Sequence, residues 1–323
     1  MKNGALREII VKPSFRIHTS LIAMHDCSLR MNGGFGFAVS IPNISIRVAK
    51  SEVFSINYNG ICDIESHFDF LRLLGDELKV KAAVSVPSNF PMHRGLGGGT
   101  SLRLAVIEAL AILNGQVHDH SELVALSGRG GTSGTGVHTY FNGGFVLDSG
   151  RKKNALHTPS SLVKGHSTPL VISCGLMPNW GVKILCPRSL VGLYGKAELE
   201  FFESTCPIPD EHAYKCAYLS MFGLTSSCFE ADFENFRESV LKVQRGFWKA
   251  REISLYPSCY RGLINEINSY DDLVAGLSSM GPAVYIIYKD DKSFEKMKRD
   301  VGLKSEDILD AEINNTGREV ILD

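Results

Sequence analysis

Residues 87–115 of the chain read PSNFPMHRGLGGGTSLRLAVIEALAILNG, a glycine-rich loop that leads into an apolar segment. The glycines of this loop are closely spaced: Gly95, Gly97, Gly98 and Gly99. Such a loop can fold tightly enough to point several backbone N–H groups at one anion. Segment 101–113 is expected to be a helix, whose N-terminus would add unpaired amides and the positive end of its dipole. The stretch therefore predicts a phosphate site, and the alternative is a glycine-rich turn without a ligand.

The residues after the glycines narrow the kind of phosphate site. The hydroxyls of Thr100 and Ser101 could donate to a phosphate oxygen or contact a Mg²⁺ that the phosphate carries. Within 102–113 only Arg103 and Glu108 are charged, so this helix is expected to be buried on most sides. No Gly-Lys-Ser/Thr follows, and the G-x-G-x-x-G spacing is not matched cleanly. Neither a Walker A loop nor a dinucleotide-binding fold is indicated.

The composition argues against several classes of partner. The 323 residues are 44% hydrophobic with a net charge of −1, which leaves no basic footprint for nucleic acid and no polybasic anchor for a membrane. No uninterrupted apolar run approaches the roughly 18 residues of a membrane-spanning helix, and the N-terminal apolar run contains charges, unlike a signal peptide. The eight cysteines are scattered without a CxxC pair. Reduced thiols in a cytoplasmic protein are expected.

The order of strand-like and helix-like segments predicts an α+β fold of two lobes. Short stretches rich in Ile, Val and Phe are expected to be strands: 7–11, 15–24, 34–41, 44–48, 80–86, 143–150, 170–176, 181–187, 283–288 and 318–323. The expected helices are 65–78, 101–113, 121–128, 229–253, 261–279 and 292–299. The polar segment 151–167 is expected to be a linker or excursion between an N-terminal lobe, 1–150, and a C-terminal lobe, 168–323.

Three motifs resemble those of the GHMP kinase superfamily. P-x-x-x-G-L-G at 91–97 resembles its phosphate loop, and LSSMGPAVYIIY at 277–288 resembles its C-terminal glycine-rich motif. GRGGTSGTGVHTYFNGGFVLD at 128–148 lies where these kinases often carry Ser-Gly-x-Asp, but here Gly136 takes the place of the acid. That carboxylate usually activates the acceptor hydroxyl, so its absence favours a reaction that deprotonates no hydroxyl.

Further stretches point to one branch of the superfamily. RIHTSL (16–21), SLRMNGGFGFAV (28–39), GRGGTSGTGV (128–137), FNGGFVLDSG (141–150) and GKAELEFF (195–202) occur in order with the motifs above. Together they closely resemble the beta-ribofuranosylaminobenzene 5'-phosphate synthases over about residues 14–288. The sequence departs from that family at Asn32, where an acid is common, and at the glycine triplet, where a serine is expected.

The resemblance implies a fold, a reaction and partners. The fold would be a GHMP-kinase-like α+β fold, with a ribosomal protein S5 domain 2-like N-terminal lobe and a ferredoxin-like α/β sandwich as the C-terminal lobe. The reaction would join phosphoribosyl pyrophosphate (PRPP) to a para-substituted benzoate, 4-aminobenzoate or 4-hydroxybenzoate, with release of CO₂ and pyrophosphate, as in methanopterin biosynthesis. Mg²⁺ would be held mainly by the pyrophosphate, with Thr100 or Ser101 as a further ligand, and a homodimer is expected. Nucleic acid and membrane partners are not.

The expected site residues come from four segments. Alternation along strand 15–21 puts Arg16, His18 and Ser20 on one face, and the first two are expected to be catalytic together with Arg129. A second anion-binding loop is expected at Gly130, Gly131, Thr132, Ser133 and Gly134. Weaker candidates for contact with the ribose or the aromatic acid are Ser20, Asn32, Gly33, Ser278, Ser279 and Gly281. The alternatives are a solvated strand face, a helix-capping turn with a surface arginine, and simple structural turns.

Three other functions stay open at this stage. A related C-nucleoside synthase would use a heteroaromatic acid. An ATP-dependent small-molecule kinase without the acidic base would bind adenine and phosphorylate an alcohol. A phosphoester-binding regulator would bind its ligand without turnover.

Overall fold

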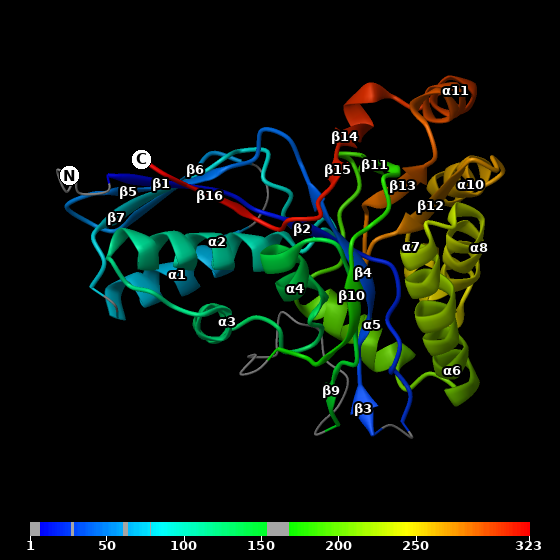
Figure 1. Cartoon of the computed structure of the whole chain (residues 1–323), viewed down its shortest axis with the longest axis horizontal. Coiled ribbons are helices and arrows are strands. Elements are labelled where there is room, and N and C mark those ends of the chain that lie inside the picture. The colour runs from blue at the N-terminus through cyan, green and yellow to red at the C-terminus, as the bar shows by residue number, and fades with distance from the viewer. Residues whose placement is uncertain (1–6, 27–28, 61–63, 78, 154–167) are drawn as a thin grey trace.

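The computed structural model describes residues 7–26, 29–60, 64–77, 79–153 and 168–323. The described residues form the α+β arrangement expected from the sequence (Figure 1). Most of the predicted linker, 151–167, lies outside them. Within the described ranges no helix is long and apolar enough to cross a membrane.

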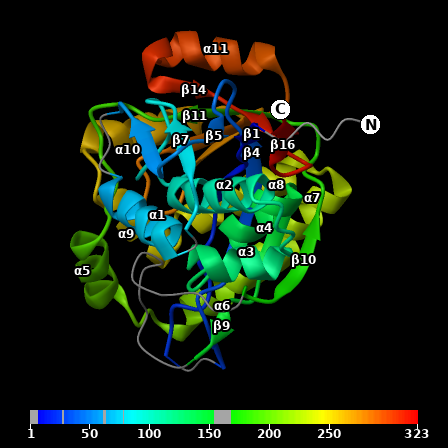
Figure 2. The ribbon, with the colours of Figure 1, turned by 90° about the vertical axis from the view of Figure 1, so that its left-hand side faces the viewer.

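A five-stranded sheet, covered by helices on one face, forms one end of the molecule (Figures 1 and 2). Its strand order is β16-β1-β5-β7-β6, antiparallel except for the parallel pair β6 and β7. The strands are β1 (Glu8–Lys12), β5 (Ile46–Lys50), β6 (Ser55–Tyr58), β7 (Ala82–Val86) and β16 (Glu319–Leu322). Helices α1 (Glu65–Glu77), α2 (Gly98–Leu113) and α3 (His120–Ser127) belong to this end. Because β16 pairs with β1, the last strand lies beside the first.

A second sheet occupies the middle of the molecule. Its order is β10-β8-β4-β15, and β2 also pairs with β4. These strands are β2 (Phe15–His18), β4 (Gly34–Ser40), β8 (Phe145–Asp148), β10 (Val171–Gly175) and β15 (Glu312–Ile313). Helix α4 (Thr135–Asn142) packs on it, and β3 (Arg30–Met31) pairs with β9 (Arg151–Lys152) below it. The division into two lobes at residues 151–167 stays a prediction. Strands β10, β15 and β16, which follow that segment, pair with strands that precede it.

A four-stranded antiparallel sheet with its helices completes the fold. The order is β12-β13-β11-β14, from β11 (Gly181–Leu185), β12 (Leu273–Leu277), β13 (Val284–Tyr288) and β14 (Ile308–Asp310). The helices are α5 (Lys196–Thr205), α6 (Asp210–Tyr218), η1 (Leu219–Thr225), α7 (Ser226–Glu230), α8 (Phe233–Gln244), α9 (Phe247–Ser254), α10 (Ser258–Ile267), α11 (Asp291–Val301) and the short η2 (Ser305–Asp307).

Two of the expected helices are wrong in part. The helix expected at 229–253 is interrupted twice: Ala231 (φ 54°) and Asp232 separate α7 from α8, and Gly246, with extended backbone (φ −67°, ψ 160°), separates α8 from α9. The helix expected at 261–279 ends at Ile267, and residues 273–277 are the fully buried strand β12. A short apolar run buried on both faces carries no period that separates strand from helix, and here pairing with β13 decides it. The helices α5 and α6 were not expected.

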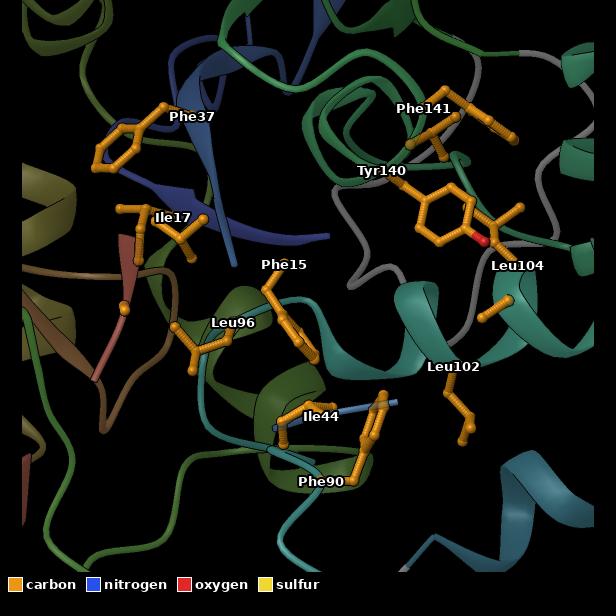
Figure 3. Close-up of a cluster of buried hydrophobic side chains, with 14 of the residues drawn as sticks. Phe15, Ile17, Phe37, Ile44, Phe90, Leu96, Leu102, Leu104, Tyr140 and Phe141 are labelled. Atoms are coloured by element: carbon orange, nitrogen blue, oxygen red, sulfur yellow. The ribbon is translucent and has the colours of Figure 1, made fainter. Parts of the chain in front are cut away.

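A large hydrophobic core holds the glycine loop, residues 91–99, in place (Figure 3). Leu96 is fully buried, and Phe90 packs against Phe15 with ring centroids 5.5 Å apart. Each fully buried side chain of this size stabilises the fold by roughly 1.5–3 kcal/mol. Apolar residues on both sides of the loop and on β2 therefore fix the loop against the strand that carries Arg16.

Candidate functional site

The glycine loop is packed so closely that side chains are excluded from it. Gly95 and Gly97 have positive φ values of 82° and 73°, and α2 begins directly after them, at Gly98. A Cβ on Gly98 would lie 2.5 Å from the carbonyl oxygen of Pro91, and one on Gly99 would lie 2.4 Å from Cε1 of His67. The amides of Gly98 and Gly99 thus begin α2 inside a tight turn, while those of Thr100 and Ser101 donate to the carbonyl of Gly97 (2.9 and 3.1 Å). This is the geometry expected of an anion site.

A cleft of about 390 Å³ opens beside the glycine loop. The predicted residues that line it are Arg16, Gly95, Gly97, Gly98, Gly99, Thr100, Arg129, Gly130, Ser133, Ser279 and Gly281. They come from β2, the glycine loop with the start of α2, the second glycine loop (residues 128–134) and the loop before β13. Residues far apart in the sequence therefore meet at one cleft.

Four arginines of the described part of the chain line the cleft, and two of them, the partly buried Arg16 and Arg129, contact the glycine loop or the start of α2. Arg16 donates to the carbonyl of Gly95 (2.6 Å) and to Ser279 Oγ (3.4 Å), and Arg129 Nε donates to Thr100 Oγ1 (3.0 Å). Burial, and then the charge of Arg129, lower the pKa of Arg16 to about 10, and burial also lowers the pKa of Arg129. Within the described residues neither group has a carboxylate within ion-pair distance. Two desolvated guanidinium groups, whose charge Glu198 offsets only in part, bind an anionic ligand well.

Aromatic and imidazole side chains form a second wall that the sequence did not indicate. His67 on α1 accepts a hydrogen bond from Arg103 Nε (3.0 Å), and His93 stacks on Tyr194 with ring centroids 4.2 Å apart. Burial, and then the charge of Arg129, lower the pKa of His67 to about 2, so its imidazole is neutral. No local motif marked His67, because it reaches the cleft from a helix before the loop.

Glu198 on α5 is the one carboxylate among the described residues that line the cleft. It lies in the GKAELEFF segment, which carried the resemblance but suggested no site residue. The described residues contain no cluster of three or more His, Cys, Asp or Glu side chains that would hold a metal alone. Ser101 lies away from the cleft, where its hydroxyl donates to the carbonyl of Ser14 (2.7 Å). Thr100 and Glu198 are therefore two of the side-chain oxygen donors that line the cleft.

The loop of residues 278–281, called the serine loop below, fastens β2 to the glycine loop. Ser278 Oγ donates to the carbonyl of Gly95 (2.7 Å) and accepts from the backbone N–H of His18 (3.0 Å). The N–H of Ser279 donates to the carbonyl of His18 (3.0 Å). Ser278 thus connects β2 to the glycine loop through its hydroxyl, whereas Ser279 lines the cleft.

His18 belongs to a buried hydrogen-bonded chain behind the cleft. Its Nε2 lies 3.2 Å from Ser133 Oγ, which lies 3.3 Å from Asp148 Oδ2, and Thr135 Oγ1 donates to the same carboxylate oxygen (2.9 Å). Burial, with smaller contributions from Arg16 and Lys249, holds the pKa of His18 well below 6.5. The sequence showed no acid after the Ser-Gly pair, but the end of β8 brings Asp148 to these hydroxyls.

The remaining predicted residues lie outside the cleft lining. Ser20 Oγ is 2.7 Å from Ser220 Oγ and accepts from the N–H of Phe35 (3.0 Å). Asn32 is buried with a φ of 63°, and a Cβ on Gly33 would meet the carbonyl of Asp148 at 2.8 Å, as expected of structural turn residues. The other predicted residues that do not line it are His18, Ser101, Gly131, Thr132, Gly134 and Ser278.

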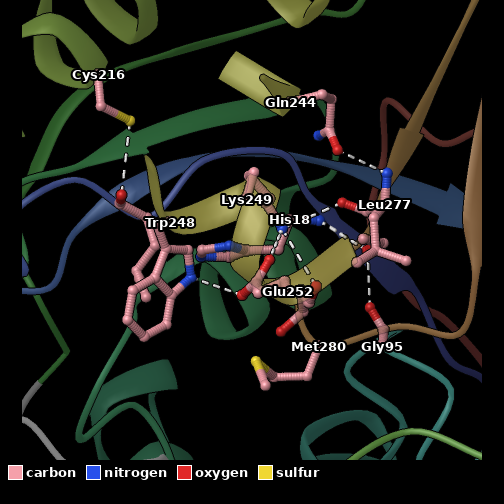
Figure 4. A network of polar contacts seen from close by, with 12 residues as sticks. His18, Gly95, Cys216, Gln244, Trp248, Lys249, Glu252, Leu277 and Met280 are labelled. Carbon is pink, nitrogen blue, oxygen red and sulfur yellow. Dashed lines mark hydrogen bonds and ion pairs between the residues drawn. The ribbon is translucent and has the colours of Figure 1, made fainter. Parts of the chain in front are cut away.

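A buried ion pair supports the serine loop from behind (Figure 4). Lys249 Nζ lies 2.6 Å from a carboxylate oxygen of Glu252, and both side chains are only 3% exposed. The same ammonium donates to the carbonyls of Leu277 (3.1 Å) and Ser279 (3.2 Å), while Trp248 Nε1 donates to Glu252 (2.6 Å). The helix α9 therefore fixes the backbone of Ser279, whose hydroxyl accepts a hydrogen bond from Arg16.

Comparisons with known proteins show which family the chain belongs to. Residues 65–143 match the family model described as the GHMP kinases N terminal domain. The chain is 30% identical to the beta-ribofuranosylphenol 5'-phosphate synthase of Archaeoglobus fulgidus over 275 residues, which are 84% of this chain and 85% of that protein. The protein of the same name from Methanocaldococcus jannaschii is 29% identical over 97% of this chain and 100% of its own length.

Solved structures show the same fold at low sequence identity. Homoserine kinase from Cytophaga hutchinsonii superposes with a TM-score of 0.65 at 15% identity, covering 99% of each chain. Phosphomevalonate kinase from Streptococcus pneumoniae also gives 0.65 at 15% identity, covering 95% of this chain and 99% of its own. The expected GHMP-kinase-like fold is confirmed.

Proposed function

Because this chain belongs to the family of beta-ribofuranosylphenol 5'-phosphate synthases, we propose that it transfers the ribosyl group of PRPP to the ring of a para-substituted benzoate. CO₂ and pyrophosphate are the other products. The observation that carries the proposal is the pair of partly buried guanidinium groups, Arg16 and Arg129, placed against two glycine loops in one cleft. A substrate with a 5'-phosphate and a pyrophosphate needs two such anion sites.

The proposed reaction moves electrons without moving a proton through the protein. The bond from ribose C1 to the pyrophosphate oxygen breaks, and its electron pair leaves with pyrophosphate. The ring carbon that bears the carboxylate then bonds to C1. Loss of CO₂ returns the electron pair of the broken carbon–carbon bond to the ring. The buried, neutral His18 fits this chemistry, because no step asks it to accept a proton from a hydroxyl.

The protein's main contribution would be electrostatic. The positive charge of Arg16 and Arg129 and the amides of α2 would stabilise the charge that develops on the leaving pyrophosphate. Removing one such preorganised donor typically lowers kcat by about 10²–10³-fold. Asp148 is proposed to act as a positioning residue, because it orients Ser133 through hydrogen bonds.

Mg²⁺ is proposed as the cofactor, brought in with the substrate pyrophosphate. One or two carboxylates plus substrate phosphates are the usual surroundings of Mg²⁺. Thr100 and Glu198, which line the cleft beside the glycine loop, fit that donor set, whereas Ser101 does not. When bound, the ion would neutralise part of the pyrophosphate charge.

Among the acceptor acids, 4-hydroxybenzoate is proposed ahead of 4-aminobenzoate. The relatives from Archaeoglobus and Methanocaldococcus are named for a ribofuranosylphenol, which retains a ring hydroxyl. A heteroaromatic acid is the alternative acceptor. The tyrosine and histidine wall at His93 and Tyr194 offers flat surfaces on which an aromatic ring could stack.

The test supplies purified protein and Mg²⁺ with PRPP and a carboxyl-labelled acid, 4-hydroxybenzoate or 4-aminobenzoate. Labelled CO₂ and pyrophosphate are expected in equal amounts, only when both substrates are present. A parallel reaction contains ATP and a panel of alcohols. ADP formation there, with no CO₂ from any aromatic acid, would identify a kinase and refute the proposal.

A further inference from the structure

A second cavity, of about 230 Å³, lies behind the serine loop and shares no lining residue with the cleft. It is enclosed by residues of α6, η1, α8 and α9 together with Leu21 and Ile208. Its apolar lining consists of Leu21, Ile208, Leu219, Val243, Phe247 and Trp248. The relatives and the proposed reaction give this cavity no role.

The charged residues of this cavity all have one sign. Lys215, Lys242 and Arg245 are exposed residues that line it, and the buried Lys249, which is paired with Glu252, lines it too. No Asp or Glu is among its described lining residues. Lys242 pairs with Glu238 on the same helix (3.1 Å), so part of its charge is already compensated. Arg245 and Lys215 supply the rest of the positive charge that solvent can reach.

The size and lining of the cavity define the ligand. An apolar cavity of about 150 Å³ holds one benzene molecule, so 230 Å³ leaves room for a ring and one small polar substituent. Trp248 offers its ring to an aromatic body, whereas the ring of Phe247 already stacks on His212 (centroids 4.8 Å apart) and contacts the guanidinium of Arg251. Arg245 can bind a carboxylate through two parallel N–H groups.

We propose that this cavity binds a small aromatic monocarboxylate at a site separate from the cleft. The ring would lie against Trp248 and the carboxylate would face Arg245 and Lys215. Lys249 joins the two sites, because it lines the cavity while its ammonium holds the carbonyl of Ser279, a cleft residue. The inference rests on the cavity alone and does not depend on the proposed reaction.

The test uses Trp248 as a reporter. The chain has two tryptophans, so Trp180→Phe leaves Trp248 as the single indole. Benzoate is titrated into this variant without PRPP or Mg²⁺, and a saturable change in fluorescence is expected. Benzamide, which has the same shape without the charge, should bind at least about ten-fold more weakly, because charge-assisted hydrogen bonds are the stronger ones.

Two further substitutions in the Trp180→Phe background locate the signal. Arg245→Glu should abolish the saturable change, whereas Lys196→Glu, on the exposed start of α5, should leave it intact. Arg129→Met, which removes a cation from the cleft, should also leave it intact. No saturable change, equal binding of benzamide, or loss of the signal in Arg129→Met with retention in Arg245→Glu would each overturn the proposal. None of these results depends on turnover, so the proposed reaction stands or fails by its own assay.

Discussion

Lys249→Met tests whether the buried ion pair holds the serine loop in place. The substitution keeps the apolar stem but removes an ammonium that contacts Glu252 and the carbonyls of Leu277 and Ser279. Breaking one partner of a buried pair leaves an uncompensated charge and typically costs about 3–5 kcal/mol of unfolding free energy. The variant should therefore be destabilised by about that amount at pH 8, as measured by urea unfolding.

The pH dependence of this loss follows from Glu252. Burial already raises the pKa of that carboxyl, and Lys249 opposes the shift. Without Lys249 the folded-state pKa rises further above the unfolded value, so the folded state binds the proton more readily. The destabilisation should be largest at pH 8 and should shrink as the pH falls toward 5.

Two controls make the result specific. Lys289→Met breaks an exposed pair with Glu234 and should cost no more than about 1 kcal/mol. The double variant Lys249→Met, Glu252→Leu removes both buried charges and should be more stable than Lys249→Met alone. If Lys249→Met costs no more than the Lys289 control, or if its loss is independent of pH, the ion pair does not support the serine loop as described.

Three other predictions concern the cleft. Gly99→Ala should weaken pyrophosphate binding, measured by calorimetry, because its Cβ would lie 2.4 Å from the His67 ring. The control Gly262→Ala, whose Cβ would have no atom within 4 Å, should bind pyrophosphate normally. Arg129→Ala should weaken Mg²⁺-pyrophosphate binding by roughly 10–100-fold in the same assay, and unchanged affinity would contradict its role. The pKa of His67 is about 2 in the folded state and near 6.5 in the unfolded state, so the unfolded state binds the extra proton. The unfolding free energy therefore decreases as the pH is lowered. Between pH 7 and pH 5 this residue should account for about 2 kcal/mol of lost unfolding free energy, which His67→Gln should restore.

Most of the fold could be predicted because its strands and helices are marked locally. The apolar helix after the glycines was expected from residue 101, and it begins at Gly98 because the last glycines form its first turn. Strand β12 could not be distinguished from a helix, since all five of its residues are buried and only its pairing with β13 identifies it. The break at Gly246 falls on a residue of low helix propensity, so a local signal for it was present in the sequence.

Residues of the candidate site could be predicted when they lie together in one segment of the sequence. They were missed when only the meeting of several segments brings them to the cleft. The strand with Arg16 and the loop with Arg129 were recognisable because polar residues or glycines are concentrated there. His67, Asp148 and Glu198 each reach the site as single residues of ordinary helices and strands, so no spacing marks them. Only the tertiary fold brings them beside the glycine loops.

The central claim is that a carbon–carbon bond forms between ribose C1 and the ring carbon that loses its carboxylate. It is tested most directly with PRPP labelled with ¹³C at C1 and 4-hydroxybenzoate labelled with ¹³C at the carboxyl-bearing ring carbon. The account predicts a product whose NMR spectrum shows one-bond coupling between the two labels, together with loss of the carboxyl group. A product that keeps its carboxyl group, or in which the two labels are not directly bonded, would contradict it.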